Sequence, residues 1–427
     1  MRVLITGAYG FIGMHVVAAL LRAGHVPVAA VRGSRAAMPG MDSVACDFTR
    51  DVDAAAWRPR LAGIDAVVNC AGILREARAG DFERVHATVP LALAQACRDA
   101  GVRRLVQVSA LGDPRDAEFV ASKHRGDEAI LRSGIDAVVL RPSVVYSTRG
   151  SYGGTTLLRG LAALPLIPIP GRGETRLQPL DAEDLAAAVL AALERPEAAG
   201  QRLELGGPEA ITLRRYLGLW RRWLGMGEAR FIAVPRALAR LGARLGEAFG
   251  RGPLGMTMWR MLERGSVVSD ASLSHSRAVL GWNPAPLEVA LARGAASSAD
   301  RWQARTVFLR PLLHAALALT FLASGAVGLM TPVAAVESLF EAGGLPQSWA
   351  GPLALGGSLA DVALGLWLLL ARRPRRPLAA MAALVVGYTV CIGALLPGVW
   401  LDPFGGLLKN IVVLVAIAIA AAGAERQ

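Results

Sequence analysis

The sequence predicts an α/β fold: a doubly wound parallel sheet with a small substrate lobe, followed by a bundle of four transmembrane helices. Three observations predict it. Short β-branched runs alternate with helical patterns, a glycine-rich turn follows the first run, and long apolar segments fill the last part of the chain. Its 427 residues are enough for two or three units. We therefore expect one domain over residues 1–300 and a membrane domain over residues 301–427.

The composition narrows the class of protein. Hydrophobic residues make up 53% of the chain, which excludes a disordered protein, and the net charge is +12. Nearly all of the basic residues are arginines, spread thinly and without a nucleic-acid-binding motif, so we expect no nucleic-acid partner. The four cysteines form no C-x-x-C pair and no cluster with histidine. We therefore expect neither a disulfide scaffold nor a metal site.

The first domain alternates strand-like and helix-like segments. The clearest expected strands are Val3–Ile5, Ala66–Val68, Leu105–Val108 and Ala137–Leu140. Because helices connect them, the strands should run in the same direction and form a parallel sheet. Proline and glycine mark loops further along, which places the substrate lobe mainly in residues 147–180 and 205–290.

Residues 235–249 predict an amphipathic helix with leucines along one face and arginines along another. Two interpretations stay open. The helix lies on a bilayer surface, as basic amphipathic helices do, or its apolar face packs against the substrate lobe. In both cases a short linker at about residues 295–305 keeps the lobe close to lipid. The substrate is therefore expected to be hydrophobic or borne by the membrane.

A glycine-rich turn between the first strand and the first helix predicts a dinucleotide site. Its spacing is G-x-x-G-x-x-G: Gly7 permits a tight turn, Gly10 lets a pyrophosphate approach the backbone, and Gly13 allows close packing of helix on strand. The N-terminus of the helix presents free N–H groups to the phosphates. The candidate cofactor-binding residues of this turn are Gly7, Tyr9, Gly10, Phe11, Ile12 and Gly13.

Residues 1–290 resemble the extended and atypical short-chain dehydrogenase/reductases, which have a Rossmann fold. The segments that carry the resemblance, besides the glycine turn, are Asn69–Gly72, Val108–Ala110, Arg141–Tyr146, Gln178–Asp184 and Leu203–Pro208. The last segment is similar to the branch that includes an accessory subunit of respiratory complex I. The resemblance implies that Asp47 contacts the adenine, that Ala71 lines the cofactor, that Lys123 holds the nicotinamide ribose, and that Ser109 polarises a substrate carbonyl.

A further expected strand, Val26–Val31, follows the first helix, and the residues after it favour NADP over NAD. An acidic side chain there would bind the ribose 2′-hydroxyl of NAD, but this chain has Arg32 and Arg35. Guanidinium groups pair with a 2′-phosphate. We therefore expect NADP as the cofactor, with NAD as the alternative.

The family's catalytic tyrosine is missing. In Y-x-x-x-K the tyrosine exchanges a proton with the substrate, and the lysine lowers its pKa. Here Lys123 is present, but Phe119 stands at the tyrosine position. A positioned general acid contributes about 10²–10⁴-fold, so this change weakens the case for alcohol dehydrogenation. Ser122 and His124 are candidate substitute donors. A quinone acceptor tolerates the loss, because its reduced form takes protons from water.

Four apolar segments predict membrane spans near residues 312–330, 353–371, 378–396 and 407–424. The alternative is a buried helical bundle in a soluble protein. The sequence has no signal-peptide pattern before the glycine turn, and the basic block Arg372–Arg376 falls between the second and third spans. By the positive-inside rule, we expect a multi-pass protein of the cell inner membrane with its first domain and both termini in the cytoplasm.

The membrane domain resembles the DoxX-like family, on segments Ala360–Gly365 and Trp400–Asn410. Some members of the wider family are quinone-linked oxidoreductase subunits. Two charged residues lie within the expected spans, Asp361 and Lys409. Charges at such depth are costly and usually face the bundle interior. Either they form an ion pair that fixes helix packing, or they flank a site for a quinone head-group or a proton.

These observations predict a membrane-tethered NAD(P)H-binding oxidoreductase whose acceptor is a membrane lipid or a quinone. The first alternative is a non-catalytic nucleotide-binding scaffold or assembly factor for a membrane complex, which Phe119 favours. The second is an epimerase or dehydrogenase acting on a lipid-linked substrate, against which Phe119 weighs most heavily.

Overall fold

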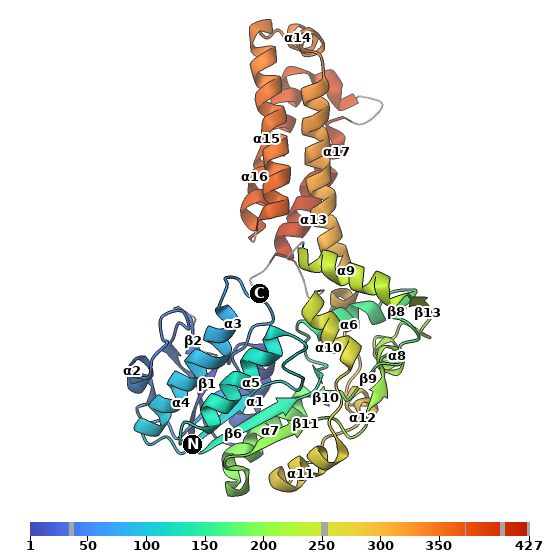
Figure 1. The fold of residues 1–427 in the computed structure, drawn as a ribbon. Helices are drawn as coiled ribbons and strands as arrows, with labels where there is room; N and C mark the ends of the chain where they lie inside the picture. The colour runs from blue at the N-terminus through green and yellow to red at the C-terminus, as the bar shows by residue number, and fades with distance from the viewer. Residues whose placement is uncertain (34–37, 249–254, 372, 402–405, 425–427) are drawn as a thin grey trace. The chain divides into compact units, whose positions relative to one another are not determined.

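The computed structural model describes residues 1–33, 38–248, 255–371, 373–401 and 406–424. Four features singled out in the sequence lie outside these residues: Arg35, Phe249, Arg372 and residues 402–405 of the Trp400–Asn410 segment. The chain divides into two compact units, Met1–Arg305 and Thr306–Gln427 (Figure 1). Each is described by itself.

The first unit is built on a seven-stranded parallel sheet with the strand order β11-β6-β5-β4-β1-β2-β3. The strands are β1 (Arg2–Thr6), β2 (Val26–Val31), β3 (Asp42–Ala45), β4 (Ala66–Asn69), β5 (Arg104–Val108), β6 (Ala137–Pro142) and β11 (Arg202–Leu205). This confirms the predicted doubly wound sheet. The order reverses between β1 and β4, and ligands of such sheets bind outside the carboxyl ends of the strands at that point.

Two hydrophobic clusters form on the opposite faces of the sheet. Val3 and Ile5 of β1 belong to one cluster and Leu4 to the other, because successive side chains of a strand alternate between faces. Helices α1 and α7 pack on the first face and α2 and α4 on the second. The helices that accompany the sheet are α1 (Phe11–Arg22), α2 (Ala54–Trp57), α3 (Asp81–Glu83), α4 (Val89–Asp99), α5 (Glu118–Leu131), α7 (Ala182–Glu194) and α11 (Asp270–Leu280).

A smaller lobe has its own core and three two-stranded sheets. The core is formed by side chains from α6, α8 and α12, with Tyr216 and Trp220 nearly fully buried. The strand pairs are β7 (Val145–Tyr146) with β10 (Leu180–Asp181), β9 (Arg176–Leu177) with β12 (Ile211–Thr212), and β8 (Ile167–Pro170) with β13 (Phe231–Val234). The helices are α6 (Gly154–Ala162), α8 (Leu213–Trp223), α9 (Arg236–Ala248), α10 (Met256–Arg264) and α12 (Leu287–Ala292).

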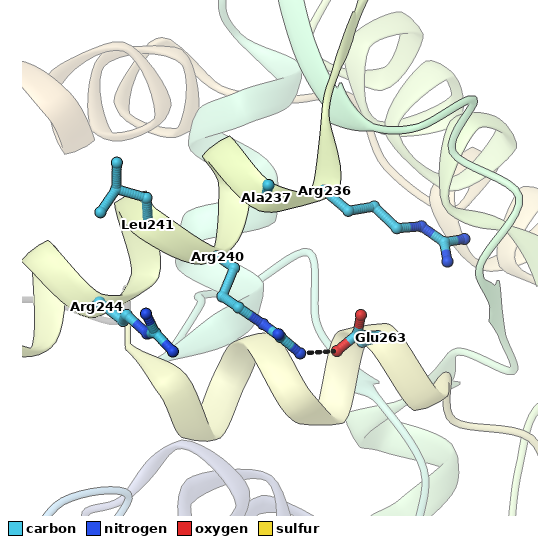
Figure 2. Close-up of a pocket in the computed structure, with 6 residues that line it drawn as sticks. All are labelled: Arg236, Ala237, Arg240, Leu241, Arg244 and Glu263. Atoms are coloured by element: carbon cyan, nitrogen blue, oxygen red, sulfur yellow. Dashed lines mark ion pairs between the residues drawn. The ribbon is translucent and has the colours of Figure 1, made fainter.

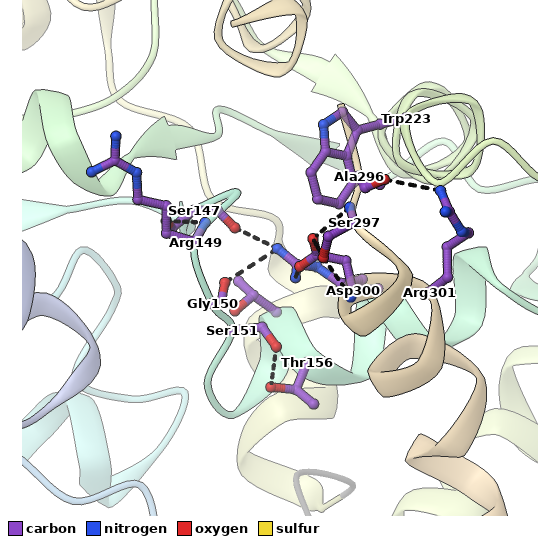
Figure 3. A network of polar contacts seen from close by, with 12 residues as sticks. Ser147, Arg149, Gly150, Ser151, Thr156, Trp223, Ala296, Ser297, Asp300 and Arg301 are labelled. Atoms are coloured by element: carbon purple, nitrogen blue, oxygen red, sulfur yellow. Dashed lines mark hydrogen bonds and ion pairs between the residues drawn. The ribbon is translucent and has the colours of Figure 1, made fainter. Parts of the chain in front are cut away.

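A buried arginine fixes the loop that leads from the sheet into this lobe. Arg159 lies over the ring of Trp220, 4.6 Å from its centroid, and donates to the carbonyl oxygens of Ser147 and Gly150. Its charge is balanced by Asp300 at 3.5 Å, in the first turn of α13 (Ser298–Met330). Figure 3 shows this network around the Ser147–Gly150 loop. The Ser147–Gly150 loop is therefore linked through Arg159 to the first turn of α13.

The second unit is all-helical. Its helices are α13, α14 (Val333–Ala342), α15 (Ala350–Leu370), α16 (Arg375–Leu395) and α17 (Leu408–Ala422). Within the described ranges, three stretches are long and apolar enough to cross a membrane: Ser298–Met330, Gln347–Leu370 and Arg375–Leu395. The fourth predicted span, 407–424, forms the 15-residue α17, which is apolar but shorter. The expected first span is the later part of a 33-residue helix, and α14 was not foreseen.

Small residues bring these helices close together. A Cβ on Gly325 would lie 2.6 Å from the carbonyl oxygen of Ser358, and one on Gly365 would lie 3.0 Å from that of Ala318. Helices α13 and α15 thus approach through their backbones, as membrane helices commonly do. Leu317, Leu368 and Met381 are buried among α13, α15, α16 and α17.

Candidate functional site

The glycine turn after β1 has no room for side chains. A Cβ on Gly13 would lie 2.1 Å from the carbonyl oxygen of Gly7, and a Cβ on Gly7 would lie 2.9 Å from the backbone nitrogen of Ala71. Gly7 also has a φ of 70°, in the left-handed region that glycine adopts without strain. The Gly10 N–H donates to the carbonyl oxygen of Gly7 at 2.8 Å, which closes the turn. Glycine is therefore required at Gly7 and Gly13 by geometry.

Helix α1 begins directly at this turn and is uncapped. Gly10 provides no side-chain cap, and the first turn contains no acidic residue. The leading N–H groups and the positive end of the helix dipole are therefore left for an anionic ligand. The predicted residues Phe11 and Ile12 begin this helix, and Tyr9 packs against the core beside it. A pyrophosphate fits this arrangement of bare backbone and helix end.

Polar side chains link the carboxyl ends of β1, β4 and β5, where Thr6, Asn69 and Gln107 are aligned in register. The Thr6 hydroxyl donates to Asn69 Oδ1, and Asn69 Nδ2 donates to Gln107 Oε1 at 2.7 Å. Asn69 Oδ1 also accepts from the N–H of Ala71 at 3.2 Å. These bonds hold the loop that contains Ala71 against Gly7, so the predicted cofactor residue Ala71 lies beside the glycine turn.

The end of β2 carries a guanidinium next to a carboxylate. Arg32 Nε lies 3.9 Å from Asp47 Oδ1, and the Arg32 side chain is 76% exposed. Asp47 Oδ1 accepts from the N–H and the hydroxyl of Thr49, and these hydrogen bonds keep the pKa of Asp47 below its usual value. Arg32 and Asp47, which the sequence analysis assigned separately to the 2′-phosphate and the adenine, thus lie close together. Arg35 lies outside the described residues.

Lys123 is buried at the opposite end of the site. Its side chain lies on α5, and Nζ donates to the carbonyl oxygen of Val108 at 3.2 Å. Burial lowers the pKa of this ammonium, while the nearby Asp127 carboxylate raises it. A Cβ on Gly72 would lie 3.3 Å from Nζ, so the glycine after Ala71 leaves space for the lysine. An ammonium with donors to spare fits the hydroxyls of a nicotinamide ribose.

The hydroxyl of Ser109 is engaged inside the protein. It donates to Asp127 Oδ2 at 2.8 Å, and Arg141 Nε donates to the same oxygen at 2.9 Å. Asp127 is fully buried, and among the described residues its Oδ1 has no hydrogen-bond partner. In this conformation the Ser109 hydroxyl donates its hydrogen bond to Asp127, so it is not available to a substrate carbonyl. Asp127 and Arg141 as a buried pair were not anticipated, although the four-residue spacing from Lys123 to Asp127 was visible on one helix.

Phe119, at the tyrosine position, belongs to an apolar cluster. Its side chain is 7% exposed, and Phe82, Ala117 and Val120 share the cluster. The ring meets those of Phe82 and His86 edge-on, with centroids 6.3 and 5.6 Å apart. The Lys123 ammonium lies 6.0 Å from the same ring. The position that holds an ionisable hydroxyl in the family is therefore occupied by packed hydrocarbon.

His86 is a buried neutral imidazole that the sequence analysis missed. The N–H of Ile73 donates to its Nε2 at 3.1 Å, so Nδ1 carries the proton and donates to the Ser122 hydroxyl at 2.9 Å. Burial, followed by the charge of Lys123, lowers the pKa of His86 to about 3. His86 is 1% exposed. Both nitrogens are used, so His86 does not exchange a proton near neutral pH.

The two proposed substitute donors are placed badly for that role. Ser122 is fully buried, and its hydroxyl donates to the carbonyl oxygens of Glu118 and Phe119 in its own helix. In this structure the proton of the Ser122 hydroxyl is engaged by the backbone of its own helix. His124 Nε2 lies 3.2 Å from the carbonyl oxygen of Ala110, and burial lowers the pKa of the imidazole.

An irregular turn sets the position of His86. Residues Arg84–Thr88 form a π-helical turn just before Pro90, whose missing N–H breaks the regular ladder. A Cβ on Gly126 would lie 1.9 Å from the carbonyl oxygen of His86, so α5 crosses this turn in close contact. Proline inside a helical pattern was the one local signal for this feature.

The charged residues of the second unit do not pair in the way first considered. Asp361 is 6% exposed and accepts from the Ser324 hydroxyl at 2.7 Å, which joins α15 to α13. Lys409 is exposed, and among the ion pairs of the described residues none joins it to Asp361. Asn410 Nδ2 donates to the Thr389 hydroxyl at 2.8 Å, which joins α17 to α16.

Within the part of the chain that the structure describes, no three His, Cys, Asp or Glu side chains come together in a way that could hold a metal ion. The candidate site consists of the glycine turn with its uncapped helix end, the buried ammonium of Lys123 and the apolar cluster around Phe119.

The fold and this site define a domain that binds a nicotinamide dinucleotide. The model of the NAD dependent epimerase/dehydratase family matches residues 3–206, and the model of the DoxX-like family matches residues 318–418. The chain is 30% identical over 313 residues to a 3-diazoavenalumate denitrifying reductase of a Streptomyces species, covering 66% of this chain and 96% of the relative. The chain belongs to the NAD dependent epimerase/dehydratase family and carries a DoxX-like membrane domain.

Two further relatives match the first unit. Ceramide reductase of Caulobacter vibrioides is 31% identical, over 45% of this chain and 61% of the relative. The mitochondrial NADH dehydrogenase [ubiquinone] 1 alpha subcomplex subunit 9 of Arabidopsis thaliana is 27% identical, over 55% of this chain and 61% of the relative. The chain spans about half to three fifths of the length of the first such relatives.

Solved structures support the fold. The structure of MoeE5 in complex with UDP-glucuronic acid and NAD superposes with a TM-score of 0.53 at 18% identity, covering 68% of this chain and 97% of that one. A UDP-N-acetylglucosamine 4-epimerase from Bacillus cereus superposes with a TM-score of 0.52 at 16% identity, over 69% of this chain and 94% of that one. At these identities the likeness concerns the fold alone.

Proposed function

We propose that this protein is a membrane-anchored oxidoreductase that binds NAD(P)H in its first unit and reduces an acceptor carried by the membrane. One observation carries the proposal: the glycine turn leaves no room for side chains, while Phe119 is packed in hydrocarbon where the family's acid would stand. The DoxX-like unit supplies the membrane location. An enzyme that keeps the dinucleotide but lacks the acid suits an acceptor that needs no protein proton donor.

A quinone meets this requirement. When bound, NAD(P)H would supply a hydride, and a quinone that accepted it together with one proton from water would become a quinol, a balanced two-electron reduction. On the protein side, the glycine turn would bind the pyrophosphate, Lys123 would orient the ribose, and Phe119 with its apolar neighbours would form a wall at the nicotinamide end. The Ser109 hydroxyl would serve a carbonyl substrate only after leaving Asp127.

NADPH is the proposed form of the cofactor. Arg32 is the exposed guanidinium at the end of β2, its contact with Asp47 is a loose one at 3.9 Å, and the ribose 2′-position is expected there. A 2′-phosphate offers Arg32 a dianionic partner in place of one shared carboxylate oxygen.

In the second unit, Asp361 is proposed as the polar group that receives the acceptor's head-group or a proton. It is buried between α15 and α13 and has a single hydroxyl partner, Ser324. Lys409 is proposed as a charge of the same membrane site. Replacing Asp361 by Asn should lower quinone-dependent activity without altering NADPH binding; equal activity would exclude Asp361 from the site.

The proposed topology places the first unit and both termini in the cytoplasm, with the protein in the cell inner membrane. The basic residues that follow α15, Arg373, Arg375 and Arg376, lie on the same side in this arrangement. A reporter that is active only in the cytoplasm tests this topology when it is fused to either end of the chain. Both fusions should be active.

The second candidate function is a nucleotide-binding scaffold for a membrane complex. Two observations favour it: no acid replaces the tyrosine at Phe119, and His86 beside it is locked in its neutral form. One relative is named as a subunit of NADH dehydrogenase [ubiquinone], which fits the same idea. Here the bound cofactor would stabilise the fold without being consumed.

Turnover with defined acceptors separates the candidates. The intact chain in lipid nanodiscs is supplied with NADPH and either a short-chain quinone or a long-chain keto lipid. The first candidate predicts oxidation of NADPH with the quinone. Binding of NADPH without oxidation by either acceptor favours the scaffold. Oxidation with the keto lipid alone favours a lipid-linked carbonyl substrate, the chemistry in the name of the ceramide reductase relative.

A further inference from the structure

Helix α9 exposes the residues that an amphipathic helix normally buries. Leu238, Leu241 and Leu245 are 58%, 49% and 51% exposed, and they lie along one face of the helix. The most buried side chain of α9 is small: Ala243 is 2% exposed. The helix therefore packs on its unit through small residues and turns its leucines outward, the reverse of a helix that serves a soluble core.

A row of arginines flanks the exposed leucines. Arg236, Arg240 and Arg244 recur at four-residue intervals and line a groove of about 350 Å³ between α9 and α10 (Figure 2). The groove also contains Glu263, which lies 3.6 Å from Arg240. Three guanidinium groups against one half-exposed carboxylate leave the groove cationic. Guanidinium groups bind phosphate in a forked, bidentate geometry.

We propose that α9 lies in the surface of the bilayer, with its leucines in the acyl region and its arginines on the phosphates of anionic phospholipids. The exposed leucines and the cationic groove together fit one occupant, the surface of an anionic bilayer. Exposed leucines at helical spacing need an apolar medium, and the adjoining cationic groove needs phosphate at the same depth. The same chain contains helices long and apolar enough to cross a membrane, so such a surface is always within its reach.

This surface gives the first unit a lipid-dependent attachment of its own. Each arginine near an anionic surface adds roughly 1 kcal/mol, which corresponds to about a fivefold change in occupancy. The attachment does not depend on the cofactor, because none of the α9 residues belongs to the glycine turn or to the Lys123 region. It predicts that the first unit responds to the lipid composition of the membrane.

A probe on α9 tests the proposal in the intact chain. Cys391 is the exposed native cysteine among the described residues and is first replaced by Ser. A polarity-sensitive fluorophore is then attached at Leu241→Cys, and at Val289→Cys as a control, since Val289 is 53% exposed on α12. Nitroxide-labelled lipid in the nanodisc quenches a probe that enters the acyl region.

With phosphatidylglycerol in the discs, the Leu241 probe should be quenched and the Val289 probe should not. The lipid-inserted fraction should fall roughly fivefold for each arginine removed in Arg240→Gln and Arg244→Gln, and Arg240→Lys should retain most of it. Quenching that is equal in pure phosphatidylcholine overturns the role of the arginines. A Leu241 probe that no lipid quenches overturns the proposal as a whole.

Discussion

The candidate site has two halves with different chemistry: a cofactor half around the glycine turn and Lys123, and an acid half around Phe119 and His86. The cofactor half contains a turn where Gly13 has no room for a Cβ, an uncapped helix, and the buried ammonium of Lys123. In the acid half, Phe119 and His86 contact each other and neither offers a proton near neutral pH. The difference supports our proposal that this site binds a cofactor without supplying an acid from the protein.

The largest effect should come from filling the turn of the cofactor half. Gly13→Val places side-chain atoms against the carbonyl oxygen of Gly7, where even a Cβ would lie at 2.1 Å. Overpacking of this kind costs about 3 kcal/mol, so the affinity for NADPH should fall roughly 100-fold. Fluorescence titration of NADPH measures it. Gly218→Ala in α8, where a Cβ meets nothing within 4 Å, is the matched control; equal losses in both would contradict the account.

Lys123→Met should change cofactor affinity and protein stability in different directions: the affinity for NADPH should fall, while stability should not. Charge-assisted hydrogen bonds contribute about 1.5–3 kcal/mol, so NADPH should bind roughly tenfold or more weakly. Because burial lowers the pKa of Lys123, keeping it charged costs folding free energy near pH 7, and methionine removes that cost.

Thermal unfolding of the Lys123→Met chain should therefore occur at the same temperature or higher, while affinity falls. Arg222→Met, at an exposed position of α8, should leave both quantities unchanged. A large drop in the unfolding temperature of Lys123→Met would instead assign the lysine a structural role.

The acid half should affect how the stability of the protein depends on pH. His86 has a folded pKa of about 3 against an ordinary 6.5, so below pH 6.5 the unfolded chain binds a proton that the folded chain does not. Above pH 6.5, His86 does not lower the free energy of unfolding. Between pH 6.5 and 5, His86 alone lowers it by about 2 kcal/mol.

His86→Gln should flatten the dependence of the unfolding temperature on pH over this window, relative to the unaltered chain. Replacing exposed His275 by Gln is the control and should leave the slope unchanged. A slope that survives in His86→Gln would show that another group titrates there.

The smallest effect is expected at the adenosine end of the cofactor half. Arg32→Ala should reduce the ratio of NADPH to NADH affinity by roughly fivefold, the size expected for an exposed ion pair of about 1 kcal/mol. Arg103→Ala, before β5 at the amino edge of the sheet, should not change the ratio. If Arg32→Ala leaves it unchanged as well, selectivity lies elsewhere in the chain.

Local signals predicted the fold and the cofactor half. The strands at Val3–Ile5 and Ala66–Val68 and the glycine turn are each encoded within a few residues, so the sequence was sufficient for them. The length of α17 could not be predicted in the same way, because an apolar stretch does not show where a helix ends.

The acid half depends on contacts between distant residues, and there the sequence fell short. Whether Ser109 faces a substrate or Asp127 is decided by α5 and β6 packing beside it. The neutral state of His86 follows from Ile73 and Ser122, which lie on separate segments. For Ser122 the sequence left both a donor role and a structural role open, because a helical position alone does not reveal that its hydroxyl bonds to its own backbone.

The most direct measurement is a single turnover of bound NADPH in the absence of oxygen, with the intact chain in nanodiscs. The absorbance of the reduced cofactor is followed after a short-chain quinone is added. The account predicts that the absorbance decays only when quinone is present, with one quinol formed for each NADPH lost. Bound NADPH that persists as long with the quinone as without it would contradict the proposed oxidoreductase.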